Sequence, residues 1–269
     1  MSYLFQLNTN SLKKLFIIFF LVKLISANAQ RVDVGFGIGI ANYWGDLAPS
    51  IALNECNPTL NVFARLNLSK VWALTGQITS LQVSGTDKNF DFNKSRNLSF
   101  TNNITEYAGI VEYNFANYGY GVLDSKITGY IFGGLAGFKY TPQTIYAGQA
   151  VNLRDLKTED VIYGTYSFAV PFGIGAKWIF ARNLSLEANF NIRKTYTDYI
   201  DDVSGKYADL SKSSLRTQQI ADRSYEVIGT KPGVAGSMRG SDNYNDWYMT
   251  FSTCLAYRLP GRIKCPSFF

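Results

Sequence analysis

Three carboxylates stand close together in the sequence at Asp198, Asp201 and Asp202, and their type and spacing could do chemistry. A pair of carboxyl groups can supply the acid and the nucleophile or base of glycoside hydrolysis. Carboxylate oxygens can also hold Ca²⁺, although this spacing differs from that of a calcium-binding loop. We expect a structural role, in which the cluster caps a loop against a nearby Lys or Arg. Metal binding and catalysis are the alternatives.

The chain contains no histidine. This excludes Ser–His and Cys–His nucleophile pairs and removes the commonest metal ligand in proteins. Gly35, Gly37 and Gly39 are spaced like part of a nucleotide-binding loop, but they alternate within an extended segment that no helix follows. We therefore expect no catalytic residue, no metal, no cofactor and no enzymatic activity.

The first 29 residues have the pattern of a secretory signal. Lys13 and Lys14 precede an apolar run from Leu15 to Ile25, and Ala27-Asn28-Ala29 places small residues at the cleavage positions. The run is shorter than the about 20 apolar residues that a membrane-spanning helix needs. We predict a signal peptide over residues 1–29 and one domain over residues 30–269, with an uncleaved anchor as the alternative.

Export changes how the charge is interpreted. The formal net charge is +6, from 26 basic and 20 acidic residues. Lys13, Lys14 and Lys23 would leave with the signal, so 23 basic residues would face 20 acidic ones, and we expect no nucleic-acid partner. Three cysteines remain, whose spacing is unlike a zinc site; one disulfide with a free thiol and three free thiols both stay open. They are Cys56, Cys254 and Cys265.

The segment 184–193 alternates strictly between apolar and polar residues. Leu184, Leu186, Ala188, Phe190 and Ile192 share one face of an extended strand, and the opposite face includes Glu187 and Arg193. Such a strand fits a membrane barrel or a soluble sandwich. Similar segments bring the total to about eight strands: 31–40, 59–68, 71–84, 104–115, 127–140, 166–179 and 246–258. Of these, 71–84 is a weaker candidate, and 127–140 is rich in glycine and ambiguous in its facing. Their length favours the barrel, because soluble strands usually have about five or six residues.

The connections between these strands alternate in length. Long ones cover 41–58, 85–103, 141–165 and 198–245, and shorter ones cover 69–70, 116–126 and 181–183. Long loops on one side and short turns on the other are typical of outer-membrane barrels. We predict an all-β protein, a transmembrane antiparallel β-barrel of about eight strands in the outer membrane, with long extracellular loops and short periplasmic turns. Its surroundings would be outer-membrane lipid.

Four acids and four bases fall on the predicted inward faces of the strands. They are Asp33, Glu106, Glu112, Glu187, Arg65, Lys177, Arg193 and Arg258. An eight-stranded barrel is just wide enough for its own side chains, and buried charges need partners. We expect a structural ion-pair network that plugs the lumen. The long loop after Tyr199 is predicted to be a solvated surface loop, with a partner-binding loop as the alternative.

Several segments together resemble one family. The most specific is Thr197–Tyr207, which contains Asp198, Tyr199, Asp201 and Asp202. Shorter pieces are Tyr43–Leu47, 96–100, 171–177, Arg239-Gly240, Asp246-Trp247-Tyr248 and Lys264-Cys265-Pro266. On these residues the sequence resembles the PorG-like outer-membrane proteins of Bacteroidota, which are also catalogued as a domain of unknown function.

The resemblance implies a component of the type IX secretion system that associates with a periplasmic ring of PorK and PorN and has no known catalytic residues. We expect the barrel to anchor or position that ring through its periplasmic side, namely residues 116–126 and a tail containing Leu259, Cys265 and Phe269. The alternative is a small outer-membrane barrel that binds or passes a hydrophobic ligand, or that stabilises the membrane. Charged inward residues disfavour an apolar lumen.

Overall fold

The computed structural model describes residues 31–91, 93–242 and 244–260. The predicted signal peptide, Cys265 and Phe269 lie outside these ranges. Within the described ranges, the helices are too short and polar for any of them to cross a membrane.

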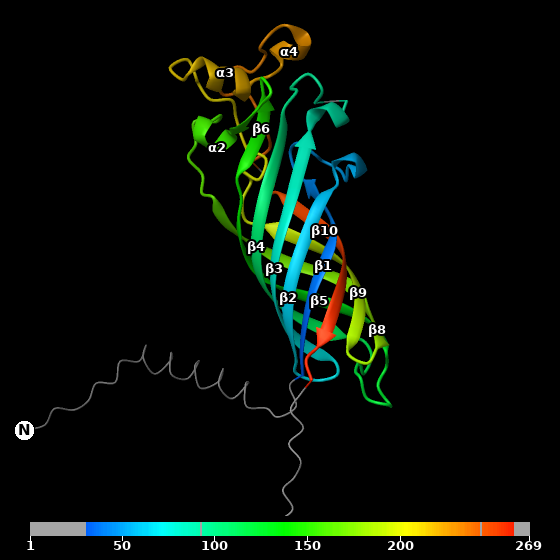
Figure 1. The fold of residues 1–269 in the computed structure, drawn as a ribbon. Coiled ribbons are helices and arrows are strands. Elements are labelled where there is room, and N and C mark those ends of the chain that lie inside the picture. Colours follow the sequence, from blue (N-terminus) through cyan, green and yellow to red (C-terminus); the bar gives the residue numbers. More distant parts are fainter. Residues whose placement is uncertain (1–30, 92, 243, 261–269) are drawn as a thin grey trace, which may run out of the picture.

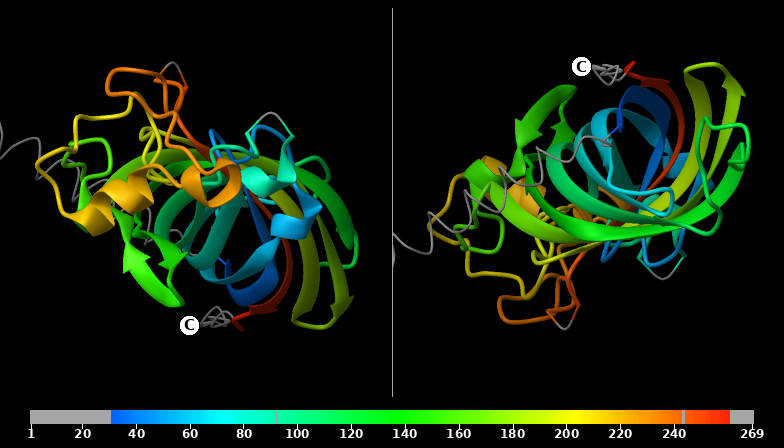
Figure 2. Two further views of the ribbon diagram at one scale, coloured as in Figure 1. Left: turned by 90° about the horizontal axis from the view of Figure 1, so that it is seen from above. Right: turned by 90° about the horizontal axis from the view of Figure 1, so that it is seen from below.

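Eight long strands close into an antiparallel barrel (Figures 1 and 2). They are β1 (Arg31–Trp44), β2 (Asn57–Asn67), β3 (Trp72–Thr86), β4 (Ser99–Asn114), β5 (Ile127–Lys139), β8 (Tyr166–Ala181), β9 (Leu184–Thr195) and β10 (Trp247–Arg258). The first strand pairs with the last, and pairing of β3 with β4 completes the ring. The predicted fold class is confirmed.

Side chains alternate between the lipid side and the lumen as the sequence indicates. Outward residues such as Phe36 and Ile38 are exposed, whereas Asp33 and Arg65 are buried inside. The segment 127–140, whose facing the sequence left ambiguous, turns Tyr130 and Phe138 inward. Glycines make room in the narrow lumen: a Cβ on Gly37 would lie 2.3 Å from the Cys254 sulfur.

The long connections gather at one end of the barrel, at the top of Figure 1, and the short turns lie at the other end. The long loops carry η1 (Leu53–Glu55), η2 (Asp87–Asn89), β6 (Pro142–Tyr146), β7 (Gln149–Asn152), α2 (Leu153–Leu156), α3 (Leu215–Ala221) and α4 (Tyr225–Ile228). The hairpin of β6 and β7 extends the sheet above the barrel, because β6 pairs with the upper end of β4. Strand β4 also begins five residues before the predicted strand, since its polar upper end contacts loops instead of lipid.

These long loops fold together into a structure that we call the extracellular cap, comprising residues 45–56, 87–91, 93–98, 140–165, 196–242 and 244–246. The prediction that the loop after Tyr199 is solvated is wrong for its first part. Ile200 and Val203 are buried, and they pack with Leu47 and Phe100 in one apolar cluster. Buried polar neighbours such as Asp201 form hydrogen bonds inside the protein, so a polar composition did not mean exposure.

Candidate functional site

The barrel lumen contains all eight of the charged side chains that the sequence places there, each at most 7% exposed. At the short-turn end, Arg258 donates two hydrogen bonds to Asp33, at 2.6 and 2.9 Å. The Arg258 guanidinium also lies 4.2 Å from the centre of the Tyr120 ring, which belongs to the turn between β4 and β5. This end of the lumen is therefore closed by an ion pair and an aromatic ring.

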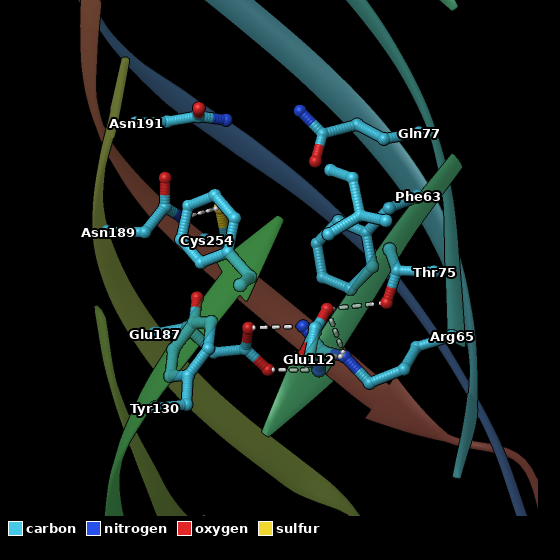
Figure 3. A pocket seen from close by; sticks show the side chains of 12 residues that line it. Phe63, Arg65, Thr75, Gln77, Glu112, Tyr130, Glu187, Asn189, Asn191 and Cys254 are labelled. Carbon is cyan, nitrogen blue, oxygen red and sulfur yellow. Dashed lines mark hydrogen bonds and ion pairs between the residues drawn. The ribbon is translucent and has the colours of Figure 1, made fainter. Parts of the chain in front are cut away.

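Arg65 is the centre of the middle group of charged residues in the lumen (Figure 3). Its two terminal nitrogens lie 2.6 and 2.7 Å from the Glu187 carboxylate, and its Nε lies 3.0 Å from Glu112. Lys177 forms an ion pair with the same Glu112 and lies 4.1 Å from the centre of the Tyr130 ring. Two bases thus compensate two acids, which offsets the cost of burying each charge.

Above this group, Arg193 donates to both oxygens of Glu106 at 3.2 and 3.1 Å, and the Tyr248 hydroxyl donates to Glu106 at 2.6 Å. The cavity drawn in Figure 3 leaves only about 20 Å³ open to water-sized molecules. That is room for about one water molecule. The described lumen is therefore a packed polar core.

Tyr43 joins the top of the lumen to the cap. Its hydroxyl forms hydrogen bonds with both Asp201, at 2.8 Å, and Asp246. A hydroxyl has one proton to donate, so the second carboxyl must itself be protonated to complete the arrangement. Burial holds the pKa of Asp201 well above its ordinary value, and the nearby Asp46 carboxylate adds to the effect.

The other members of the acidic cluster have separate surroundings. Asp202 accepts hydrogen bonds from the hydroxyls of Thr158 and Tyr163, both at 2.5 Å. The Tyr199 ring stacks on Tyr163 with ring centres 4.4 Å apart. One carboxylate oxygen of Asp198 is buried without a hydrogen-bond partner among the described residues, and burial raises the pKa of Asp198 to about 8. The structure does not bring these three aspartates together around a common point, and the described residues include no group of His, Cys, Asp or Glu arranged to hold a metal ion.

Two arginines that the sequence did not single out as site residues hold the cap together. Arg239 donates to Glu159 at 2.9 Å and to the Asp202 carbonyl at 2.6 Å. Arg96 donates to both oxygens of Asp87, at 2.8 and 2.6 Å. Arg239 appears in the segments that carry the family resemblance, whereas Glu159 stands in a loop without any periodic signal.

The periplasmic turn between β4 and β5 presents an exposed apolar tip. Val122 and Leu123 are 100% and 98% exposed. Asp124 accepts from the Gly121 amide at 2.9 Å and pairs with Lys70 at 2.7 Å, so hydrogen bonds hold the turn in place. Leu259 lies at the same end, where its amide donates to the Val32 carbonyl at 2.9 Å. Of the predicted periplasmic contacts, only Leu259 and the turn fall within the described residues.

The outside of the barrel is an apolar belt between two rows of aromatic residues. Trp44 and Trp247 lie at the long-loop end, and Trp72 and Trp178 lie at the short-turn end. Exposed Ile, Phe, Val and Leu residues lie on the strands between them. Cys56 and Cys254, the cysteines within the described ranges, are free thiols. A closed antiparallel barrel with this exterior is built for the outer membrane, and the protein is an outer-membrane β-barrel.

Residues 12–230 match the family model described as "Domain of unknown function (DUF6089)". The chain belongs to the DUF6089 family. Among curated proteins, none matches the sequence significantly.

The DUF6089 chain is also similar to solved outer-membrane barrels. Ail of Yersinia pestis is 10% identical with a TM-score of 0.42, covering 86% of this chain and 99% of Ail. Neisserial surface protein A is 9% identical with a TM-score of 0.44, covering 85% and 97%. A major outer membrane protein of Thermus thermophilus is 14% identical with a TM-score of 0.42, covering 86% and 100%. All three TM-scores are below 0.5, so the assignment as a barrel depends on the strand pairing of this chain itself.

Proposed function

We propose that this DUF6089 protein is a non-enzymatic outer-membrane component of the type IX secretion system that anchors or positions the periplasmic PorK/PorN-type ring. The observation that carries the proposal is the exposed apolar pair Val122 and Leu123, at the tip of a periplasmic turn that hydrogen bonds hold in place. The PorG-like sequence segments suggest the identity of the partner.

The tip has the properties of a docking point. Burying an aliphatic side chain contributes about 1.5–3 kcal/mol, so a partner that covers Val122 and Leu123 would gain appreciable binding energy. Lys126 adds to the order of the turn by donating to the Gly121 carbonyl at 2.8 Å. A turn that is already ordered loses less conformational entropy on binding.

The filled lumen favours a scaffold over the alternative, a barrel that passes a hydrophobic ligand. Passage would need an apolar path, whereas Arg65, Glu187 and Arg193 cross the middle of the described lumen. Opening that path would separate buried ion pairs, at a cost of several kcal/mol. A role that uses the ends of the barrel needs no such change.

The test is affinity purification of the barrel with its ring proteins. The double variant Val122→Asp/Leu123→Asp should lower the recovery of PorK/PorN-type proteins about tenfold, because it places two charges in the contact. A second variant ends the chain after Pro260 and removes the predicted tail contacts Cys265 and Phe269. Leu53→Asp, an 82% exposed leucine in the extracellular cap, is the matched control and should have no effect. Unchanged recovery of ring proteins with both periplasmic variants would contradict the proposal.

A further inference from the structure

The four tryptophans of the chain are divided evenly between the two membrane interfaces, but only the outer two lie side by side. Trp44 and Trp247 are register partners on β1 and β10, with ring centres 6.2 Å apart. Trp72 and Trp178, at the periplasmic interface, stand on β3 and β8, which are not neighbours in the barrel. An aromatic girdle explains single tryptophans at each interface. The outer pair differs, because its two rings together form a continuous aromatic surface that is larger than that of one tryptophan.

A groove of about 460 Å³ opens beside this pair. Its apolar wall consists of Trp44, Trp247, Pro49 and Tyr244, and Asp46 and Asn245 add polar groups to the lining. The Trp44 indole donates to the Pro49 carbonyl at 3.1 Å, and Trp247 packs edge-on against Phe172 with ring centres 6.4 Å apart. These contacts hold both indole rings in place, so the groove is formed without a ligand.

The chemistry of this lining suits a sugar ring. The C–H face of a pyranose is apolar and can stack on an indole or phenol ring, while its hydroxyls need hydrogen-bonding groups at the edge. Asp46 can accept from a hydroxyl, and the Asn245 amide can both donate and accept. Asp46 already accepts from the Ser241 amide at 2.8 Å, so an acyl chain alone would leave chiefly the Asn245 amide without a hydrogen-bonding group in the groove.

A positive charge stands next to the groove on the lipid-facing surface. Lys194 on β9 is the register partner of Trp247, and its ammonium lies 5.8 Å from the centre of a Trp247 ring. Within the described ranges, no carboxylate lies within 4.0 Å of this ammonium. A phosphate at the level of the headgroups would supply the missing counter-charge.

We propose that Trp44, Trp247 and Lys194 form a binding site for the phosphorylated sugar headgroup of an outer-leaflet glycolipid. The sugar would stack beside the tryptophan pair, and the phosphate would pair with Lys194. The site takes a lipid and not a free sugar phosphate, because the surface below it is apolar and exposed. Ile40 and Phe251 are register partners there, and Phe190 pairs with Phe251 from the next strand, so acyl chains would lie along this row.

The experiment uses the full chain, which is inserted into membranes and then purified from them in detergent. Diphosphoryl lipid A is the probe. Binding is measured by titration and native mass spectrometry. Trp247→Ala should weaken binding about tenfold, the effect of losing a stacked aromatic contact of about 1.4 kcal/mol. Trp178→Ala, a half-exposed tryptophan at the periplasmic interface, is the matched control and should bind as the unchanged protein does.

The role of Lys194 is tested by combining variants of its side chain with lipid A that carries or lacks its phosphates. Lys194→Gln should weaken binding of diphosphoryl lipid A about fivefold and leave binding of dephosphorylated lipid A unchanged, and Lys194→Arg should retain binding. Heat-modified migration on a gel shows that each variant is folded. Equal losses with Trp247→Ala and Trp178→Ala would overturn the site. Binding of phosphatidylglycerol or of free glucosamine phosphate as tight as that of lipid A would overturn the assignment of the ligand.

Discussion

The guanidinium of Arg65 on β2 forms two parallel hydrogen bonds with the carboxylate of Glu187 on β9, at 2.6 and 2.7 Å, across the interior of the barrel. Arg65 also contacts Glu112 on β4, so one side chain connects three parts of the wall. A bidentate pair has a defined direction as well as a strength. The pair therefore fixes the distance between strands that do not neighbour each other in the sheet.

Glu187→Leu should destabilise the barrel by about 3–5 kcal/mol, because it leaves the buried Arg65 guanidinium short of a counter-charge. Urea unfolding in detergent, followed by heat-modified migration on a gel, measures the loss. The double variant Arg65→Met/Glu187→Leu should recover most of the stability, since Glu112 keeps its ion pair with Lys177. Unfolding of Glu187→Leu at the urea concentration of the unchanged protein would argue against the network.

Tyr43→Phe should loosen the extracellular cap while the barrel stays folded. The substitution removes the hydroxyl between Asp201 and Asp246 and leaves two buried carboxyls without that partner, at a cost of about 1–3 kcal/mol. Limited proteolysis should cut residues 198–246 faster. Tyr107→Phe, an exposed tyrosine on the lipid side, is the control. Equal cleavage rates for both variants would show that the hydroxyl does not hold the cap.

Gly39→Ala should lower the yield of folded barrel strongly, whereas Gly76→Ala should leave it nearly unchanged. A Cβ at Gly39 would lie 2.0 Å from the backbone carbonyl oxygen of Phe251 on the paired strand, and a Cβ at Gly76 would meet nothing within 4 Å. Overpacking of this kind costs about 1–3 kcal/mol or more, because backbone atoms must move. The measurement is the folded fraction after refolding into detergent, and similar fractions for the two variants would contradict the prediction.

The cap should become less stable as the pH rises from about 4 to about 8. Folding raises the pKa of Asp198 from 3.8 to about 8, so the folded cap holds a proton that the unfolded loop releases. This stabilisation is fully present below about pH 4 and is lost as the pH rises through about 8. Hydrogen exchange of the cap amides at pH 6 and pH 9 should show the change, and Asp198→Asn should reduce it. A pH-independent exchange free energy would contradict the assignment.

The sequence by itself determined the barrel, the approximate position of each strand and the inward position of the eight charges. These follow from a local rule, because alternate residues of a strand point to opposite faces and a narrow barrel has only lipid or lumen to offer them. The short turns and long loops could be predicted for the same reason, because they are the segments between the alternating strands.

Only the tertiary structure decided which of these groups meet. Arg65 and Glu187 are 122 positions apart, and their contact depends on how the sheet closes and how its strands are staggered. The contacts of the cap could not be predicted from the sequence pattern. Tyr43 on β1 contacts Asp201, which belongs to a loop distant in the sequence, and Arg239 binds Glu159, which belongs to another loop. Loops held by side-chain hydrogen bonds have no repeating period, so their burial is set by the folded chain around them.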